Sequence, residues 1–313
     1  MIRIGLAGTW HVHFGGYANA ARRDPRCRIT ALWDPDPVRG KQAAAGQSCD
    51  FEPTPEALCA REDVDAVLVC CETNLHEAAI TAAANAGKHV FTEKVLCIEP
   101  EAAERTAEAV RRGGISFCIS FPWRCRSDFL WIKEALDGGL VGRPTFCRMR
   151  NTHNGAIAGW LPESFFDPGI CGGGAMMDLG AHGMYLLNWL LGEPVKAASA
   201  FTSVTGKAVE DNALTALVFE NGAIGVNETG FVSNCDPFAF ELTGEKGTIL
   251  AGGFLDRVCY NTGEGWRFPN LPKAMPDPLT AWLDSIENGT PSPFGIDDAA
   301  ALTKTMALAY RNA

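Results

Sequence analysis

The chain has 313 residues, 47% of them hydrophobic, and a formal net charge of -10 at pH 7. A chain of this length can bury a large apolar core and is expected to form two domains. The negative charge and the lack of any long basic run exclude a nucleic-acid partner, because phosphate binding needs clustered Lys and Arg side chains.

The amino terminus and the cysteines indicate in which cellular compartment the protein is expected. The first residues, MIRIGLAG, have the pattern of a strand rather than that of a signal peptide, and no segment is apolar for long enough to span a membrane. The twelve cysteines are scattered, often within apolar runs such as VLVCC, and form no CxxC pair. We therefore expect buried, reduced thiols in a cytoplasmic protein rather than disulfides or a zinc-thiolate site.

The first third of the chain alternates short β-rich runs with Ala-rich stretches. The expected strands are residues 2–8, 27–34, 64–70, 89–94 and 115–120. The expected helices include residues 16–23, 77–87 and 101–113. Strands that alternate with helices predict right-handed βαβ units and a parallel sheet.

The pattern changes after Pro122. A helix is expected at residues 128–139, a half-buried strand at 144–153 and one continuous helix at 172–192. Strand-like runs follow, joined by the turn sequences ENG, GEKG and TGEG. This order predicts an antiparallel sheet with a helix packed against it.

A glycine-containing loop, GLAGTWHVHFGG, follows the first strand. Gly8 occupies the first position of a dinucleotide fingerprint, but Trp10 and His13 replace the second and third glycines. Backbone N–H groups and the helix dipole bind phosphates, so the motif can tolerate this change. We expect Gly8, Thr9, Trp10 and His11 to contact a pyrophosphate, and the two glycines that follow to allow close packing.

Asp34 ends the second strand, slightly more than twenty residues after the loop. A carboxylate there can accept hydrogen bonds from both ribose hydroxyls and repel a 2′-phosphate, which favours NAD over NADP. The alternative is that Asp34 only begins the Asp-Pro-Asp-Pro turn.

Several segments in order resemble the Gfo/Idh/MocA family of nicotinamide-dependent oxidoreductases. They are WDPDPVRGK, CETNLHEAAI, FTEKVLC, GGGAMMDLGAHGMYLLNWLLGEPV and ALAYRNA, which extend over nearly the whole chain. The resemblance implies an α/β fold with an N-terminal Rossmann NAD-binding domain, residues 1–121. A C-terminal α+β domain for substrate and oligomerisation, with a largely antiparallel open sheet, is expected at residues 122–296. A terminal helix, 297–313, is expected to pack on the first domain.

The resemblance also implies an activity and its partners: an NAD-dependent oxidoreductase that acts on a secondary hydroxyl of a sugar, inositol or related polyol, as a homo-oligomer. Contacts with the cofactor are expected from four regions of the chain besides the loop. These residues are Arg39, Thr73, Asn74, His76, Glu93, Lys94 and Arg124.

Hydride transfer needs a group that takes the hydroxyl proton and a positive group that stabilises the alkoxide. Lys94, Asp178 and His182 supply these groups. Asp178 and His182 are spaced i, i+4 and are expected to share one helix face, although a plain helix-surface pair is the alternative. The family motif has proline where this chain has Val95, so we expect the constraint on Lys94 to be lost and a trans Lys94–Val95 bond to aim the lysine differently.

Three further residues are candidates for the substrate cleft: His13, His153 and Trp160. An aromatic cover would suit a sugar ring. Exposure of His153 in a loop and core packing of Trp160 are the alternative interpretations.

Other functions remain open at the level of sequence. The NAD could stay bound and be recycled while a glycoside is cleaved or eliminated. We assign no metal ligands, but His11 and His13 share a face if their segment is extended, which would allow a metal-dependent enzyme. A non-catalytic NAD or sugar sensor is disfavoured because it would not need Lys94, Asp178 and His182.

Overall fold

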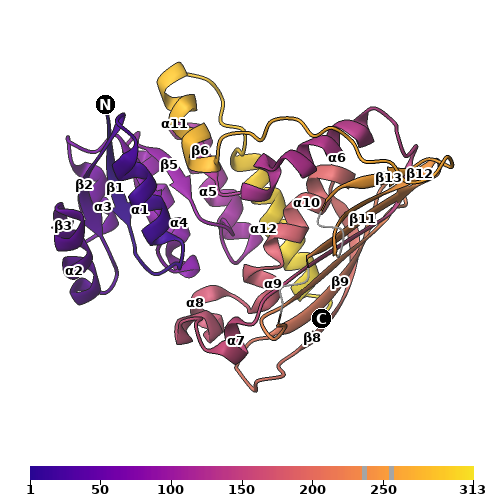
Figure 1. The fold of residues 1–313 in the computed structure, drawn as a ribbon. Coiled ribbons are helices and arrows are strands. Elements are labelled where there is room, and N and C mark those ends of the chain that lie inside the picture. Colours follow the sequence, from indigo (N-terminus) through magenta and orange to yellow (C-terminus); the bar gives the residue numbers. More distant parts are fainter. Residues whose placement is uncertain (235–237, 254–256) are drawn as a thin grey trace. The chain divides into compact units, whose positions relative to one another are not determined.

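The computed structural model describes residues 1–234, 238–253 and 257–313 (Figure 1). The chain divides into two compact units. Unit 1 comprises Met1–Ser120 and Pro276–Thr303, and unit 2 comprises Phe121–Met275 and Lys304–Ala313. The division between Thr303 and Lys304 lies within helix α12, Ile296–Tyr310.

Unit 1 contains a parallel six-stranded sheet with the order β3-β2-β1-β4-β5-β6. The strands are β1 Ile2–Ala7, β2 Cys27–Trp33, β3 Asp50–Glu52, β4 Ala66–Val69, β5 His89–Thr92 and β6 Phe117–Ile119. This is the order of a dinucleotide-binding Rossmann sheet. All four residues of β4 are buried, as expected for a central strand covered on both faces.

The helical segments of unit 1 include α1 Phe14–Arg23, α2 Pro37–Gln47, α3 Pro55–Ala60, η1 Thr73–Leu75, α4 His76–Asn85, α5 Pro100–Gly113 and α11 Pro278–Asn288. Three of these, α2, α3 and α11, begin at a side-chain cap. The side chains of Asp36, Thr54 and Asp277 each accept a backbone N–H in the first turn of the helix that follows. In each case proline comes next, and its fixed φ suits the first helical position.

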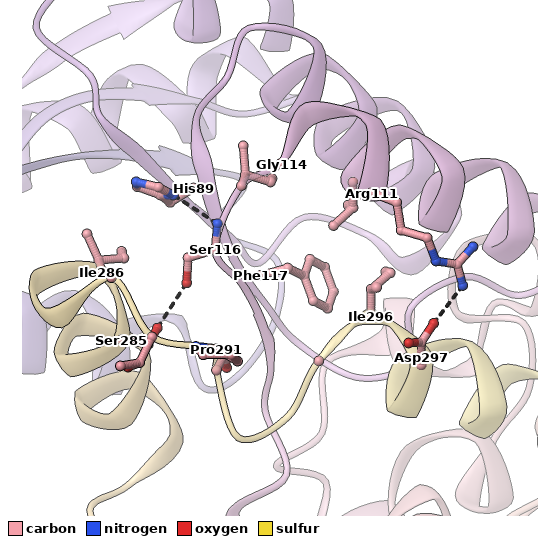
Figure 2. A pocket seen from close by; sticks show the side chains of 16 residues that line it. His89, Arg111, Gly114, Ser116, Phe117, Ser285, Ile286, Pro291, Ile296 and Asp297 are labelled. Atoms are coloured by element: carbon pink, nitrogen blue, oxygen red, sulfur yellow. Dashed lines mark hydrogen bonds and ion pairs between the residues drawn. The ribbon is translucent and has the colours of Figure 1, made fainter.

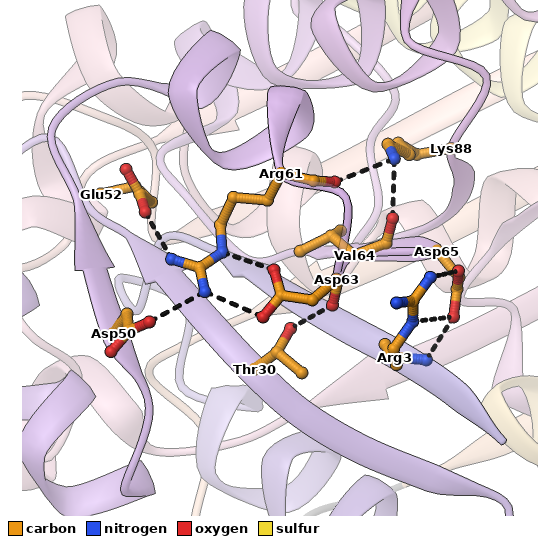
Figure 3. A network of polar contacts seen from close by, with 9 residues as sticks. All are labelled: Arg3, Thr30, Asp50, Glu52, Arg61, Asp63, Val64, Asp65 and Lys88. Carbon is orange, nitrogen blue, oxygen red and sulfur yellow. Dashed lines mark hydrogen bonds and ion pairs between the residues drawn. The ribbon is translucent and has the colours of Figure 1, made fainter.

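A network of charged side chains ties the amino-terminal edge of this sheet together (Figure 3). The guanidinium of Arg61 contacts Asp50, Glu52 and Asp63 at 2.7–2.8 Å. The hydroxyl of Thr30 donates to the carbonyl of Asp63 at 2.9 Å. These contacts join β2 and β3 to the segment before β4, at the end opposite the edge where open α/β sheets bind their ligands.

Unit 2 contains a seven-stranded sheet with the order β13-β12-β11-β7-β10-β9-β8. The strands are β7 Pro144–Thr152, β8 Pro194–Thr202, β9 Asn212–Phe219, β10 Ile224–Gly230, β11 Ala239–Gly244, β12 Gly247–Gly252 and β13 Cys259–Asn261. The β7–β10 pair is parallel, and the other pairs are antiparallel. Together with the parallel sheet of unit 1, this confirms the expected fold class.

One face of the second sheet packs against helices. Residues Cys147, Met149, Leu217 and Leu242 alternate along their strands with more exposed neighbours and are fully buried. Helix α10, Ala181–Leu191, lies against β7 and β10. The other helical segments of this unit are η2 Pro122–Cys125, α6 Ser127–Asp137, α7 Gly155–Ala158, η3 Glu163–Phe166, α8 Pro168–Cys171 and α9 Ala175–Asp178.

The continuous helix expected at residues 172–192 is wrong. The chain forms α9, then a turn at Leu179 and Gly180, then α10. The N–H of Gly180 donates to the carbonyl of Ala175, five residues back, at 2.8 Å. One extra residue is thereby inserted into the helical path, and the amide of Asn227 donates to the Gly180 carbonyl at 2.7 Å. Asp178 therefore ends one helix and His182 lies in the next.

The glycines before α9 serve packing within unit 2. A Cβ on Gly173 would lie 2.0 Å from the Tyr310 hydroxyl oxygen, and one on Gly174 would lie 1.9 Å from the Glu210 carbonyl oxygen. The Glu210 carboxylate accepts the N–H groups of Gly174 and Met176, both at 3.0 Å, and the Tyr310 hydroxyl at 2.6 Å. Close contact with the chain itself thus explains these two glycines.

Among the cysteines in the described part of the chain, all eleven are free thiols and most are buried. Burial raises the pKa of several of these thiols, for example that of Cys97 to about 11. No helix in residues 1–234, 238–253 and 257–313 is both long and apolar enough to cross a membrane.

Candidate functional site

Three of the predicted residues follow strand ends at the carboxyl edge of the sheet in unit 1. Gly8 follows β1, Asp34 follows β2 and Glu93 follows β5. Gly8 has φ 83°, and a Cβ there would lie 2.2 Å from the Cα of Cys71. Only glycine fits this position, because the left-handed backbone and the close approach of the segment after β4 both exclude a side chain.

The loop from Thr9 to His13 leads into α1 and uses some of its own N–H groups. The Thr9 N–H donates to Asp34 at 2.9 Å, and the His11 N–H donates to the Cys70 carbonyl at 3.1 Å. The expectation that these two groups point to a pyrophosphate therefore does not hold in this structure. Trp10 and His11 are themselves buried.

Gly15 and Gly16 lie in the first turn of α1, where a helix leaves N–H groups without intrahelical acceptors. A Cβ added at either residue would meet no atom within 4 Å. The expectation that these glycines allow close packing is therefore wrong. The space beside them is open, as needed where a ligand approaches the backbone at a helix N-terminus.

The Asp34 carboxylate is buried and accepts several hydrogen bonds. Its Oδ2 accepts the N–H and the hydroxyl of Thr9, at 2.9 and 2.6 Å. Its Oδ1 accepts the Asp36 N–H and Nε of Arg39, both at 2.9 Å. Asp34 thus forms the turn that we considered as the alternative, and it also holds the loop and Arg39 in place.

Arg39 also binds Glu72, with 2.7 Å between Nη2 and Oε1. The other oxygen of Glu72, Oε2, is buried and has no hydrogen-bond partner among the described residues. A buried acceptor of this kind is costly unless a donor is supplied. Glu72 was not among the predicted site residues, although it lies in the CETNLH segment that carries the resemblance.

Glu93 is the centre of a buried polar cluster. Its Oε1 lies 2.8 Å from Nδ1 of His13 and accepts the hydroxyl of Tyr17 at 2.5 Å. Burial alone would raise the pKa of the Glu93 carboxyl, but the hydrogen bond to His13 and the charges of His13 and Lys94 outweigh burial and hold that pKa well below its usual range. Burial and the Glu93 carboxylate raise the pKa of Tyr17 well above its usual value. Glu93 is therefore an anion and Tyr17 a neutral donor.

Lys94 follows Glu93, and its side chain is buried. The Lys94–Val95 peptide bond is cis, so the expected trans bond is wrong. Contacts on both sides hold this segment: the Lys94 N–H donates to Oε2 of Glu93 at 3.0 Å, and the Val95 carbonyl lies 2.9 Å from Nδ1 of His76. The tertiary environment, rather than a proline, determines the geometry here.

His76 is buried, with Nδ1 facing the Val95 carbonyl and Nε2 facing the Cys71 carbonyl at 3.2 Å. Burial lowers the pKa of His76, so the ring is neutral and donates one hydrogen bond. Its ring joins two loops that follow neighbouring strands. Of the other predicted residues in this segment, Thr73 is buried and Asn74 is exposed.

The predicted residues of unit 2 lie around α10. Nδ1 of His182 is 2.9 Å from the Tyr185 hydroxyl, which also accepts the Trp123 N–H at 3.2 Å. The rings of His182 and Trp123 are stacked at 5.6 Å. Arg124 lies over the ring of Trp189 at 4.9 Å. Tyr185 and Trp123 position the imidazole. Neither was among the predicted site residues, although Tyr185 lies in the GGGAMMDLGAHGMYLLNWLLGEPV segment that carries the resemblance.

The two substrate candidates of unit 2, His153 and Trp160, pack against each other with their rings tilted. The ring centroids of His153 and Trp160 are 4.6 Å apart, and His153 is nearly parallel to Phe231 at 4.9 Å. The Trp160 indole N–H donates to Asn154 at 3.1 Å, and half of its surface is exposed. Trp160 is thus a surface aromatic side chain rather than a core residue.

A pocket of about 520 Å³ in unit 1 contains none of the predicted site residues (Figure 2). His89 and Ser116 line it near the amino ends of β5 and β6, where the Ser116 N–H donates to the His89 ring at 3.0 Å. Arg111 and Asp297 form an ion pair at its rim. It therefore lies away from the carboxyl ends of the strands, where such sheets bind nucleotides.

Comparison with known proteins matches both units to one family. Residues 2–121 match the family model described as an oxidoreductase family with an NAD-binding Rossmann fold. Residues 129–250 match the model of the GFO/IDH/MocA C-terminal domain.

Curated relatives and solved structures agree with these models. Myo-inositol 2-dehydrogenase of Thermotoga maritima is 31% identical over 67% of this chain, a match that spans 63% of that relative, less than two thirds. Inositol 2-dehydrogenase 4 of Saccharopolyspora erythraea is 28% identical over 96% of this chain and 88% of its own length. A levoglucosan dehydrogenase solved with NADH and levoglucosan is 19% identical, with a TM-score of 0.85 over 99% of this chain and 96% of that one. The chain belongs to the GFO/IDH/MocA family of NAD-binding oxidoreductases.

Proposed function

We propose that the protein is an NAD-dependent dehydrogenase that moves a hydride between nicotinamide and a secondary hydroxyl or ketone of a sugar, inositol or related polyol. The observation that carries the proposal is the grouping of Gly8, Asp34 and Glu93 at the carboxyl ends of β1, β2 and β5. Relatives named for inositol and for 1,5-anhydro-D-fructose support the substrate class.

The carboxyl edge of the sheet in unit 1 fits a dinucleotide. The open space beside Gly15 and Gly16 would receive the pyrophosphate at the start of α1. A ribose hydroxyl would donate to the buried acceptor Oε2 of Glu72, beside the ion pair of Arg39 and Asp34. Arg39 is already paired with two carboxylates, which leaves little positive charge for a 2′-phosphate and favours NAD.

Bound NAD supplies the hydride acceptor for the substrate carbon. We assign the remaining steps to three side chains. Lys94 stabilises the developing alkoxide with its ammonium group, His182 takes the hydroxyl proton and Asp178 binds the same hydroxyl. The Tyr185 hydroxyl, 2.9 Å from Nδ1, holds the His182 ring for this transfer.

The first experiment is calorimetry with NAD and NADH, followed by an absorbance assay with myo-inositol, scyllo-inositol and, in the reverse direction, 1,5-anhydro-D-fructose. Binding of NAD with accumulation of free NADH supports a dehydrogenase. Turnover without net NADH would instead indicate a recycled cofactor. If neither NAD nor NADH binds, the proposal fails.

The second experiment replaces His182 with Ala. We expect the rate of hydride transfer to fall by roughly 10²- to 10⁴-fold while NAD affinity is unchanged. His89→Gln, in the pocket of Figure 2, is the matched control and should keep the wild-type rate. A wild-type rate in His182→Ala would remove this residue from the mechanism.

We also propose a cytoplasmic homo-oligomer that associates through the open face of the sheet in unit 2. Ile224 pairs with Val218 across β10 and β9, and both side chains are exposed together with Leu214. On the same face, Glu228 binds Arg148 and Arg150 at 2.7 Å. Light scattering should show an oligomer that Ile224→Glu dissociates, and a monomeric wild-type protein would refute this part.

A further inference from the structure

Two histidines and a carboxylate form a cluster in unit 1, and the proposed hydride transfer gives no role to the two histidines. One nitrogen or oxygen atom of each of His11, His13 and Glu93 lies within 4.8 Å of the others. His11 and Glu93 are buried, whereas 49% of the His13 side chain is exposed. Two members of the cluster are therefore buried, and the third, the imidazole of His13, faces solvent. An ion could enter the site past His13.

The residues come together from two separate segments. His11 and His13 belong to the loop between β1 and α1, and Glu93 follows β5. His13 stands where the dinucleotide fingerprint has its third glycine, so phosphate binding does not explain an imidazole there. Trp10, at the second glycine position, packs edge-on against His11 with 5.8 Å between ring centroids.

The interatomic distances are close to those of a metal centre. Nδ1 of His13 and Nδ1 of His11 lie 2.8 and 3.8 Å from Oε1 of Glu93. In a tetrahedral zinc site, with ligands about 2.0–2.2 Å from the ion, neighbouring ligand atoms are roughly 3.3 Å apart. The ligand atoms of the two histidines lie within 4.8 Å of each other, so side-chain movements on the order of 1 Å would bring all three distances to those of a tetrahedral site.

The protonation state of His11 is also suitable. The backbone N–H of His13 donates to Nδ1 of His11 at 3.2 Å. Because a backbone N–H can only donate, this Nδ1 carries a lone pair and no proton, which is the state that a metal ion requires.

Both oxygens of the Glu93 carboxylate accept hydrogen bonds that would keep it oriented as a metal ligand. Oε2 of Glu93 accepts the Lys94 N–H at 3.0 Å, and Oε1 accepts the hydroxyl of Tyr17 at 2.5 Å. The Tyr17 hydroxyl oxygen in turn lies 2.7 Å from that of Ser120. Such outer contacts orient ligands and commonly affect metal affinity.

We propose that His11, His13 and Glu93 bind one divalent transition-metal ion, with Zn²⁺ as the best match to their chemistry. Two neutral imidazoles and one carboxylate leave a site charge of +1 and an open fourth position for water or an oxygen ligand. The ion takes the place of the proton shared by His13 and Glu93, and that proton passes to solvent. No group is oxidised or reduced.

The test uses full-length protein without a histidine tag, freed of metal with a chelator. Titration with Co²⁺ should produce the visible absorption of a tetrahedral nitrogen and oxygen site at one ion per chain, and Zn²⁺ should displace it. His13→Ala and His11→Ala should each weaken Zn²⁺ affinity by at least roughly tenfold, since even outer-contact changes have such effects. The matched control, His89→Gln, should bind as wild type does.

Tyr17→Phe removes a hydroxyl but no ligand, and should weaken Zn²⁺ affinity by roughly ten- to a hundredfold while keeping one ion per chain. Lack of stoichiometric binding, or unchanged affinity in both His13→Ala and His11→Ala, would overturn the proposal. Melting curves confirm that each variant is folded. NAD binding is measured on the same samples, so that failure of the metal site is distinguished from failure of the proposed dehydrogenase function.

Discussion

Nε of Arg39 donates to Oδ1 of Asp34 across 2.9 Å, and the same guanidinium reaches Glu72 at 2.7 Å. The arginine that could neutralise a phosphate is thus bound by two carboxylates at the end of β2. This ion pair disfavours NADP at the carboxyl edge of the sheet. A 2′-phosphate would have to compete with Asp34 and Glu72 for Arg39, and its negative charge would lie close to the Asp34 carboxylate.

Asp34→Ala should therefore shift cofactor preference from NAD toward NADP. Loss of a charged hydrogen-bond partner costs about 1.5–3 kcal/mol, which corresponds to roughly a ten- to hundredfold weaker NAD affinity. Calorimetry with both nucleotides measures the change. A variant that keeps the wild-type preference would contradict the role given to this carboxylate, and Asp36→Ala, at the exposed N-cap of α2, is the control.

Gly15→Ala should reduce NAD affinity by roughly tenfold, the effect of about 1.4 kcal/mol, without loss of stability. A Cβ there meets no protein atom, and alanine in a helix stabilises the fold slightly. The measurement pairs NAD titration with urea unfolding. Unchanged NAD affinity would show that the pyrophosphate does not approach this turn.

Gly174→Ala should destabilise unit 2, because its Cβ would lie 1.9 Å from the Glu210 carbonyl oxygen. We expect a decrease of about 1–3 kcal/mol in the free energy of unfolding. Gly46→Ala, in α2 with no atom within 4 Å of the added Cβ, is the matched control and should be neutral or slightly stabilising. Equal stability of the two variants would contradict the packing role of the GGG segment.

We expect the ion pair of Arg3 and Asp65 to contribute to the free energy of unfolding in a pH-dependent way. Arg3 hydrogen-bonds to the Asp65 carboxyl at 2.6 Å and, despite partial burial, lowers the pKa of Asp65 to about 2 (Figure 3). Because the folded pKa lies below the unfolded value of about 3.9, the stabilisation is present above pH 4 and disappears as the pH falls toward 2.

Asp65→Asn should accordingly lower the urea midpoint at pH 7, and the difference from wild type should shrink as the pH approaches 3. The pair is partly exposed, so the effect is small and should decrease with added salt. Asp63→Asn, beside Arg61 in the same network, tests whether the neighbouring pair behaves alike. A difference that is constant with pH would argue against ionisation of Asp65 as its cause.

The strands of unit 1 other than β3, and the carboxyl ends that carry Gly8, Asp34 and Glu93, could be predicted from the sequence. The three-residue strand β3 and the short helix α3 were not predicted. Apolar runs, glycines and caps act over a few residues, and parallel strands bring their carboxyl ends to one edge whatever the loops contain. The motif segments likewise sufficed to identify the family, which both family models confirm.

Only the tertiary structure decided the details that carry the chemistry. The break between Asp178 and His182 depends on a hydrogen bond from Asn227, which lies on strand β10. The cis Lys94–Val95 bond has His76 and Glu93 beside it, and the grouping of His11, His13, Tyr17 and Glu93 joins residues about 80 positions apart. Hydrogen bonds and packing between distant segments outweigh local preference at these points, and local sequence patterns contain no information about such partners.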